Sequence, residues 1–158
     1  MVKILGTYAI SYTKNPENLR EAYNILIVDP LDFNEINLEK FPIRPQPLVT
    51  IKIVLVEFNS TLGMDEALAI IADSTLDLER PVYEDAILFW QQHHNEVGGE
   101  RVIVFPHEPF YDECHIGSIV SMHKGMWGRH IGFTLSNTPV GHNLILAFRK
   151  RPVPISIS

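Results

Sequence analysis

The sequence predicts an α+β fold, namely a single layered domain with a mixed or antiparallel sheet, a C-terminal three-stranded meander and two to three helices. Strand and helix patterns follow one another up to residue 99, in an order that is typical of layered α+β domains. After Arg101 the pattern changes to short strands. The length of 158 residues, 46% of them hydrophobic, fits one globular domain over residues 1–158.

The first part of the chain predicts a strand, a helix and a long connector. Residues 3–12 alternate between apolar and polar positions, as in a half-buried strand. Asn15-Pro16-Glu17 is typical of a helix start, because Asn caps the helix, Pro fits its first position and the acid faces its positive end. Residues 29–47 carry four prolines and no period, which predicts an irregular connector.

The middle of the chain predicts the centre of the sheet and two further helices. Residues 48–58 are apolar on both parities, which indicates a strand that is covered on both faces. Residues 64–73 and 81–96 repeat apolar side chains at helical spacing. Gly98-Gly99 ends the second helix, since glycine tolerates a left-handed turn.

Four short strands are predicted in the last third of the chain, over residues 101–105, 116–123, 130–135 and 142–149. Parity aligns the last three as a meander, with His123 opposite His130 and Leu135 opposite Leu144. This register gathers one apolar face, made of Val120, Met122, Ile131, Phe133, Leu135, Leu144, Leu146 and Phe148.

Charge is distributed unevenly beneath the net value of −6. Residues 1–113 hold all nineteen acids and eight of the thirteen Lys/Arg, whereas residues 114–158 hold five Lys/Arg and no acid. All seven histidines lie between His93 and His142. Such asymmetry indicates either two surfaces of opposite sign, which favour self-association as a homodimer, or an anion-binding face.

An anion site is predicted on the polar face of the meander. The register places His123, His130 and Arg149 side by side across three strands. Arginine binds carboxylate or phosphate through two parallel hydrogen bonds, and histidine adds charge below neutral pH. The alternative is a solvated sheet edge whose charges deter aggregation.

A metal site is the alternative use of the histidine-rich segment. Residues 107–115 supply the ligand types that Zn²⁺ or a similar divalent metal binds, with His107, Asp112 and His115 as candidates. Their spacing matches no established zinc motif, and a loop of this polarity is also expected when it is simply solvated.

Several function classes have no sequence support. The serine-hydrolase, P-loop and dinucleotide motifs are absent, so no catalytic residue is assigned and an enzyme is not favoured. The negative net charge opposes nucleic-acid binding, and no apolar run reaches the length of a membrane span. Because Cys114 is the only cysteine and no signal sequence is evident, we expect a cytoplasmic protein.

The chain also resembles a family of small uncharacterised bacterial and phage proteins. Four segments carry the resemblance, namely Ile51-Lys52-Ile53-Val54-Leu55-Val56-Glu57-Phe58-Asn59, Asp65-Glu66-Ala67, Val102-Ile103-Val104-Phe105 and Leu146-Ala147-Phe148-Arg149-Lys150. The family has no assigned activity, so the resemblance implies none. The final hairpins look like a C-type lectin module, but paired cysteines and a Trp-Asn-Asp motif are missing.

Together these patterns predict a non-enzymatic binding or interaction domain. Its partner is another protein, a second copy of the chain or a small anion, and no cofactor is required. The alternative is a small metal-binding protein or enzyme that uses the histidine-rich segment 93–142.

Overall fold

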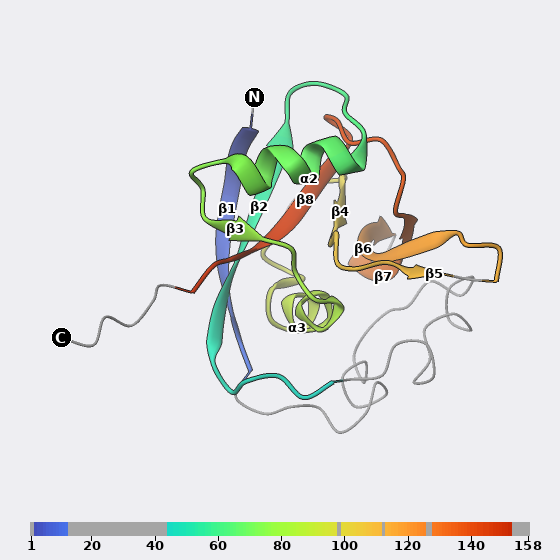
Figure 1. The fold of residues 1–158 in the computed structure, drawn as a ribbon. Helices are drawn as coiled ribbons and strands as arrows, with labels where there is room; N and C mark the ends of the chain where they lie inside the picture. Colours follow the sequence, from blue (N-terminus) through green and yellow to red (C-terminus); the bar gives the residue numbers. More distant parts are fainter. Residues whose placement is uncertain (1, 13–43, 98, 112, 126–127, 153–158) are drawn as a thin grey trace.

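Strands dominate the computed structural model, which describes residues 2–12, 44–97, 99–111, 113–125 and 128–152. The strands are β1 Val2–Ser11, β2 Thr50–Phe58, β3 Leu78–Glu79, β4 Val102–Val104, β5 Phe110–Tyr111, β6 Gly117–Gly125, β7 Gly128–Leu135 and β8 Leu144–Lys150. The helices are α2 Met64–Asp73 and α3 Tyr83–His93. Figure 1 shows how these elements are arranged.

All eight strands join one mixed sheet. Its path runs β1-β2-β8-β4-β6-β5, with β3 paired to β8 and β7 paired to β6. The ladder between β4 and β8 is parallel, and the others are antiparallel. In the part of the chain that the structure describes, β8 therefore lies near the middle of the sheet and β1 at one edge.

Among the described elements, one helix covers each face of the sheet. On one face α3 packs its apolar residues against Ile53 and Leu55 of β2 and Met122 of β6. On the other face α2 packs against Val56 of β2 and Leu146 of β8. Figure 1 shows α2 lying across β1, β2 and β8, whereas α3 is seen nearly end-on. Burial on both faces explains why β2 is apolar at both parities.

The predicted fold class is wrong. Among the described residues the structure is mostly β, with 44% strand against 18% helix, and is dominated by its sheet rather than being an α+β fold with two to three helices. Two strands of only two residues each join the sheet: β3 pairs with the distant β8, and β5 pairs with the nearby β6. Such short strands leave no alternating pattern to detect.

The predicted meander is half right. The register of β6 against β7 is confirmed, with His123 opposite His130 and Val120 opposite Phe133. The third strand is wrong, because β8 pairs with β2, β3 and β4. Residues 144–148 of β8 are all buried, as in a central strand covered on both sides.

As a result, the predicted apolar face is divided between the two faces of the sheet. Val120, Met122, Ile131 and the half-buried Phe133 pack on the α3 side. Leu144, Leu146 and Phe148 pack on the α2 side. Leu135 is 51% exposed and joins neither cluster.

The two helices predicted in the middle of the chain are confirmed. The predicted bounds of 64–73 are those of α2, and α3 begins two residues later and ends three residues earlier than predicted. The helix start at Asn15 and residues 29–43 of the connector lie outside the described residues, whereas residues 44–49 form no helix or strand. Among the described residues, no helix is long and apolar enough to cross a membrane.

Truncating the central strand tests this topology. We expect Leu146→Ala to lower the free energy of unfolding by about 2–5 kcal/mol, because Leu146 is fully buried and its removal leaves a cavity. Leu135→Ala is the matched control and should change it by about 0.5 kcal/mol or less, since this side chain is half exposed. Equal losses in chemical denaturation would contradict the observed strand order.

Candidate binding site

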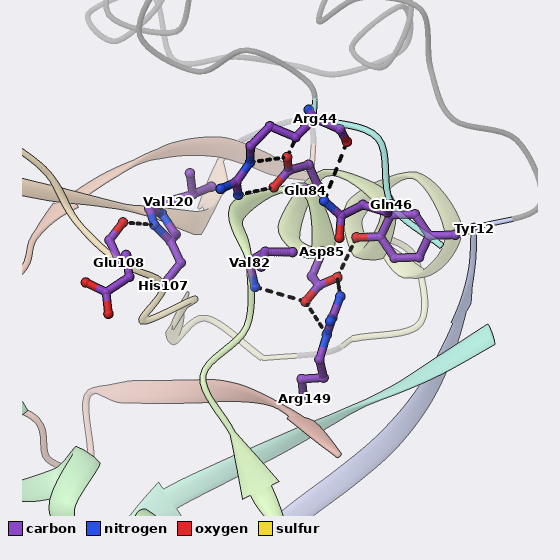
Figure 2. Close-up of polar contacts among 10 residues, drawn as sticks. All are labelled: Tyr12, Arg44, Gln46, Val82, Glu84, Asp85, His107, Glu108, Val120 and Arg149. Atoms are coloured by element: carbon purple, nitrogen blue, oxygen red, sulfur yellow. Dashed lines mark hydrogen bonds and ion pairs between the residues drawn. The ribbon is translucent and has the colours of Figure 1, made fainter. Parts of the chain in front are cut away.

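A buried carboxylate at the start of α3 joins three parts of the fold. Asp85 is fully buried and accepts hydrogen bonds from Tyr12 Oη at 2.5 Å and from Arg149 Nη2 at 2.8 Å on Oδ1. Its Oδ2 accepts from Arg149 Nε at 3.1 Å and from the Val82 backbone N–H at 3.0 Å. Figure 2 shows these three residues converging on Asp85 from the end of β1, the end of β8 and the residue before α3.

The chemistry of this cluster is that of a balanced buried ion pair. Arg149 presents the planar fork that matches a carboxylate, and the Val82 N–H adds the bond that an acidic residue at the third helical position commonly accepts. Burial, followed by the charge of Asp85, raises the pKa of Tyr12, so this hydroxyl stays protonated as a donor. The four hydrogen bonds that Asp85 accepts therefore stabilise the folded chain.

A second carboxylate on the same helix turn holds the chain that leads into β2. Glu84 is 3% exposed and accepts from the backbone N–H, Nε and Nη2 of Arg44 at 3.1, 2.8 and 2.7 Å. The Arg44 guanidinium also lies 4.5 Å from the centre of the Tyr83 ring. The hydrogen bonds to Glu84 raise the pKa of Arg44. Arg44 is thereby tied to the start of α3 (Figure 2).

A groove opens where β2 and β8 diverge, beside Arg149. The ladder between these strands ends at Ile53 opposite Arg149. Beyond this point, Lys150 pairs with Leu78 of β3 and the Arg151 N–H donates to the Asp77 carbonyl at 2.8 Å, so β8 turns away from β2. The resulting wedge groove has a volume of about 550 Å³. It is lined by Pro47, Val49, Thr50, Ile51, Lys52, Glu79, Arg149, Lys150, Arg151 and Pro152.

The wedge groove combines apolar walls with positive charge. Val49 is 50% exposed, and Leu48 beside it is 64% exposed. Lys52, Lys150 and Arg151 are exposed around the groove, against one acidic lining residue, Glu79. Six of the ten lining residues are polar or charged, so the groove presents apolar surface and charge side by side.

A smaller hollow of about 360 Å³ lies between the start of α2 and the loop that leads to β5. Arg80, its basic lining residue, donates to the Pro106 and His107 carbonyls and to Glu108 at 2.9–3.0 Å. Because its guanidinium is directed at protein acceptors, this hollow is a weaker candidate than the wedge groove.

The predicted anion row is not assembled. Val104 of β4 pairs with Ser121 of the antiparallel β6 and with Leu146 of the parallel β8, so these three residues lie in one row across the sheet. Because β6 and β8 run in opposite directions, His123 lies two residues from this row towards one end of the sheet, and Arg149 lies three residues from it towards the other end. Arg149 therefore lies at the other end of the sheet, where it binds Asp85 and lines the wedge groove. The meander register placed it beside the histidines because it paired β8 with β7.

The two histidines of the row do lie together. The rings of His123 and His130 stack with centroids 5.7 Å apart and an angle of 18° between their planes. Ser121 Oγ lies 2.7 Å from His123 Nε2 and accepts a hydrogen bond from Thr134 Oγ1 at 2.9 Å. Ser121 is fully buried, which keeps this hydroxyl from acting as an accessible nucleophile.

The structure does not bring the predicted metal ligands together among the described residues. His107 is 2% exposed, and its two ring nitrogens are engaged by the Val120 N–H at 2.9 Å and the Glu108 carbonyl at 2.7 Å (Figure 2). Asp112 lies outside the described residues, and His115 is exposed with φ of +62°. No group of three His, Cys, Asp or Glu side chains with metal-binding geometry occurs in the described residues.

Sequence reasoning missed Asp85 and the wedge groove. Asp85 is the third residue of α3, where an acid is expected as a solvated helix-start signal rather than as a buried anion. The run Arg149-Lys150-Arg151 at the end of a strand is the local signal for the groove, although the divergence of β8 from β2 is not visible in sequence.

Neutralising Asp85 tests the ion pair. We expect Asp85→Asn to lower the free energy of unfolding by about 3–5 kcal/mol, because the partly buried Arg149 charge loses its partner. Glu108→Gln is the control, since the Arg80–Glu108 pair is exposed and should contribute about 1 kcal/mol or less. Similar small losses for both variants in urea denaturation would show that Asp85 does not anchor the fold.

The buried imidazole makes stability depend on pH. Burial lowers the pKa of His107 to about 4, and the hydrogen bond from Val120 also requires a neutral Nε2. Between about pH 6.5 and 4 the unfolded chain binds a proton that the folded chain does not, so this contribution to stability is lost as the pH falls. The loss from this residue should reach about 3 kcal/mol.

His107→Gln should therefore flatten the fall of unfolding free energy between pH 6.5 and 4, measured by chemical denaturation at several pH values. His142→Gln replaces an exposed histidine and should leave the wild-type slope. A wild-type slope in His107→Gln would mean that this imidazole is not held neutral.

Comparisons with known proteins identify no relative: neither a family model, nor a curated protein, nor a solved structure matches this chain. The resemblance to small bacterial and phage proteins thus remains a prediction.

Proposed function

We propose that this protein is a non-enzymatic binding domain whose wedge groove recognises a ligand that combines a negative charge with an apolar part. The observation that carries the proposal is the lining of the groove, where three exposed cations surround apolar walls and face a single carboxylate. The single cysteine, Cys114, supports the cytoplasm or another reducing compartment as the place of action.

The construction of the groove supports binding rather than catalysis. Arg149, at the end of the β2–β8 ladder, is oriented by two bonds to Asp85, so it is a fixed part of the wall. The Lys150 Nζ donates to the Leu76 carbonyl at 2.8 Å, which ties its side chain while its charge remains exposed. Lys52 and Arg151 are then the cations best placed to meet an anionic ligand.

Octanoate is a minimal probe of this function, with octylammonium as the probe of opposite charge. We expect octanoate to shift the amide resonances of residues 49–52 and 149–151 in NMR spectra and to bind more tightly than octylammonium. Its binding should weaken as salt is added. Exposed ion contacts contribute about 0.2–1 kcal/mol each, so Lys52→Gln with Arg151→Gln should weaken binding about twofold to thirtyfold.

Lys124→Gln is the matched control, because Lys124 is an exposed lysine near the other end of the sheet. It should bind octanoate like the wild type. Equal binding of both probes, or equal affinities in the two sets of variants, would refute recognition of an anion in the wedge groove.

A further inference from the structure

One strand is left half paired inside the wedge groove. Residues Thr50–Lys52 of β2 pair with Ser11–Ala9 of β1, but the ladder with β8 stops at Ile53. Within the described chain, this stretch of β2 therefore has a neighbouring strand on one side only. The open side faces the groove, which Thr50, Ile51 and Lys52 all line.

The direction of the backbone bonds follows from the β1 ladder. The Tyr12 N–H donates to the Val49 carbonyl at 2.9 Å, so this carbonyl faces β1. Ser11, which lies opposite Thr50, bonds to the Gln92 side chain through its N–H and carbonyl, so the Ser11–Thr50 pair exchanges no backbone hydrogen bond. Successive residues of an antiparallel pair direct their amide groups to opposite edges. The N–H and carbonyl of Thr50 consequently point away from β1, towards the wedge groove, where β8 no longer pairs with β2.

The side chains along this edge alternate in chemistry. Ile51 packs towards the α3 face of the sheet, and Val49 shares its parity. Thr50 and Lys52 belong to the opposite face, on the side of α2. An added strand would therefore meet apolar side chains on one face and positive charge on the other.

We propose that the wedge groove binds an extended acidic segment of a partner protein, which adds to the edge of β2 at Thr50–Lys52. This inference rests on the proposed function and names its ligand class. Main-chain hydrogen bonds supply affinity in such strand addition, and alternate side chains supply specificity. The geometry selects a segment in which apolar residues alternate with Asp or Glu, so that the acids meet Lys52 and the neighbouring cations.

The probe is the peptide acetyl-Val-Glu-Val-Glu-Val-Glu-amide with a fluorescent label, measured by anisotropy. We expect it to bind at least tenfold more tightly than the corresponding Val-Lys peptide. Lys52→Gln should weaken its binding, whereas Lys124→Gln should not.

Two N-methylated versions test the backbone bonds without altering the protein. One carries methyl groups on the valine amides and the other on the glutamate amides. In an added strand only one of these two sets faces β2. We therefore expect one methylated peptide to lose at least tenfold in affinity and the other to bind within about threefold of the parent, because its methyl groups face away from the partner strand.

The outcomes separate this inference from the proposed function. If octanoate binds but no acidic peptide does, or if both methylated peptides bind like the parent, strand addition is refuted and anion recognition stands. If neither octanoate nor the acidic peptide binds, both proposals fail. If sedimentation shows a dimer that the peptide dissociates, a second copy occupies the groove and a separate partner is refuted.

Discussion

The buried charge of Asp85 constrains the positions of three parts of the fold, namely the ends of β1 and β8 and the start of α3. A carboxylate without water is costly unless a cation and hydrogen-bond donors surround it. The requirement is met by Arg149 of β8, by Tyr12 directly after β1 and by the Val82 N–H directly before α3. Because Arg149 is also the last residue of β8 that pairs with β2, the ion pair sets the point from which the two strands diverge. The groove therefore opens directly beside the ion pair, and Arg149 belongs to both.

Elements with a local pattern were predictable from sequence. Consecutive residues show the 3.6-residue period of α2 and α3 and the alternation of apolar and polar side chains in β6 and β7. The register of His123 against His130 follows from this alternation. Long-range pairing was not encoded in this way. β8 was assigned to β7 because one parity was apolar, although Ile145 and Ala147 make the other parity apolar as well, which indicates a strand covered on both faces.

The candidate site was only partly visible for the same reason. Arg149 was selected for its chemistry, but its neighbours depend on strand order, and the structure gives it Asp85 in place of two histidines. His107 was selected as a ligand type, and burial instead makes it an internal acceptor for Val120. Burial and neighbours across the sheet are tertiary properties, which residue type and spacing do not specify.

The place of β8 in the sheet affects how the protein is made. This strand is the last of the described strands in chain order, yet it fills the gap between β2 and β4. While a ribosome is still synthesising residues 144–150, β2 and β4 each lack a partner on the side that β8 will occupy, and such open edges favour aggregation. Closure of the sheet is therefore a late, long-range event, and a nascent chain that stalls before β8 is the form most in need of a chaperone.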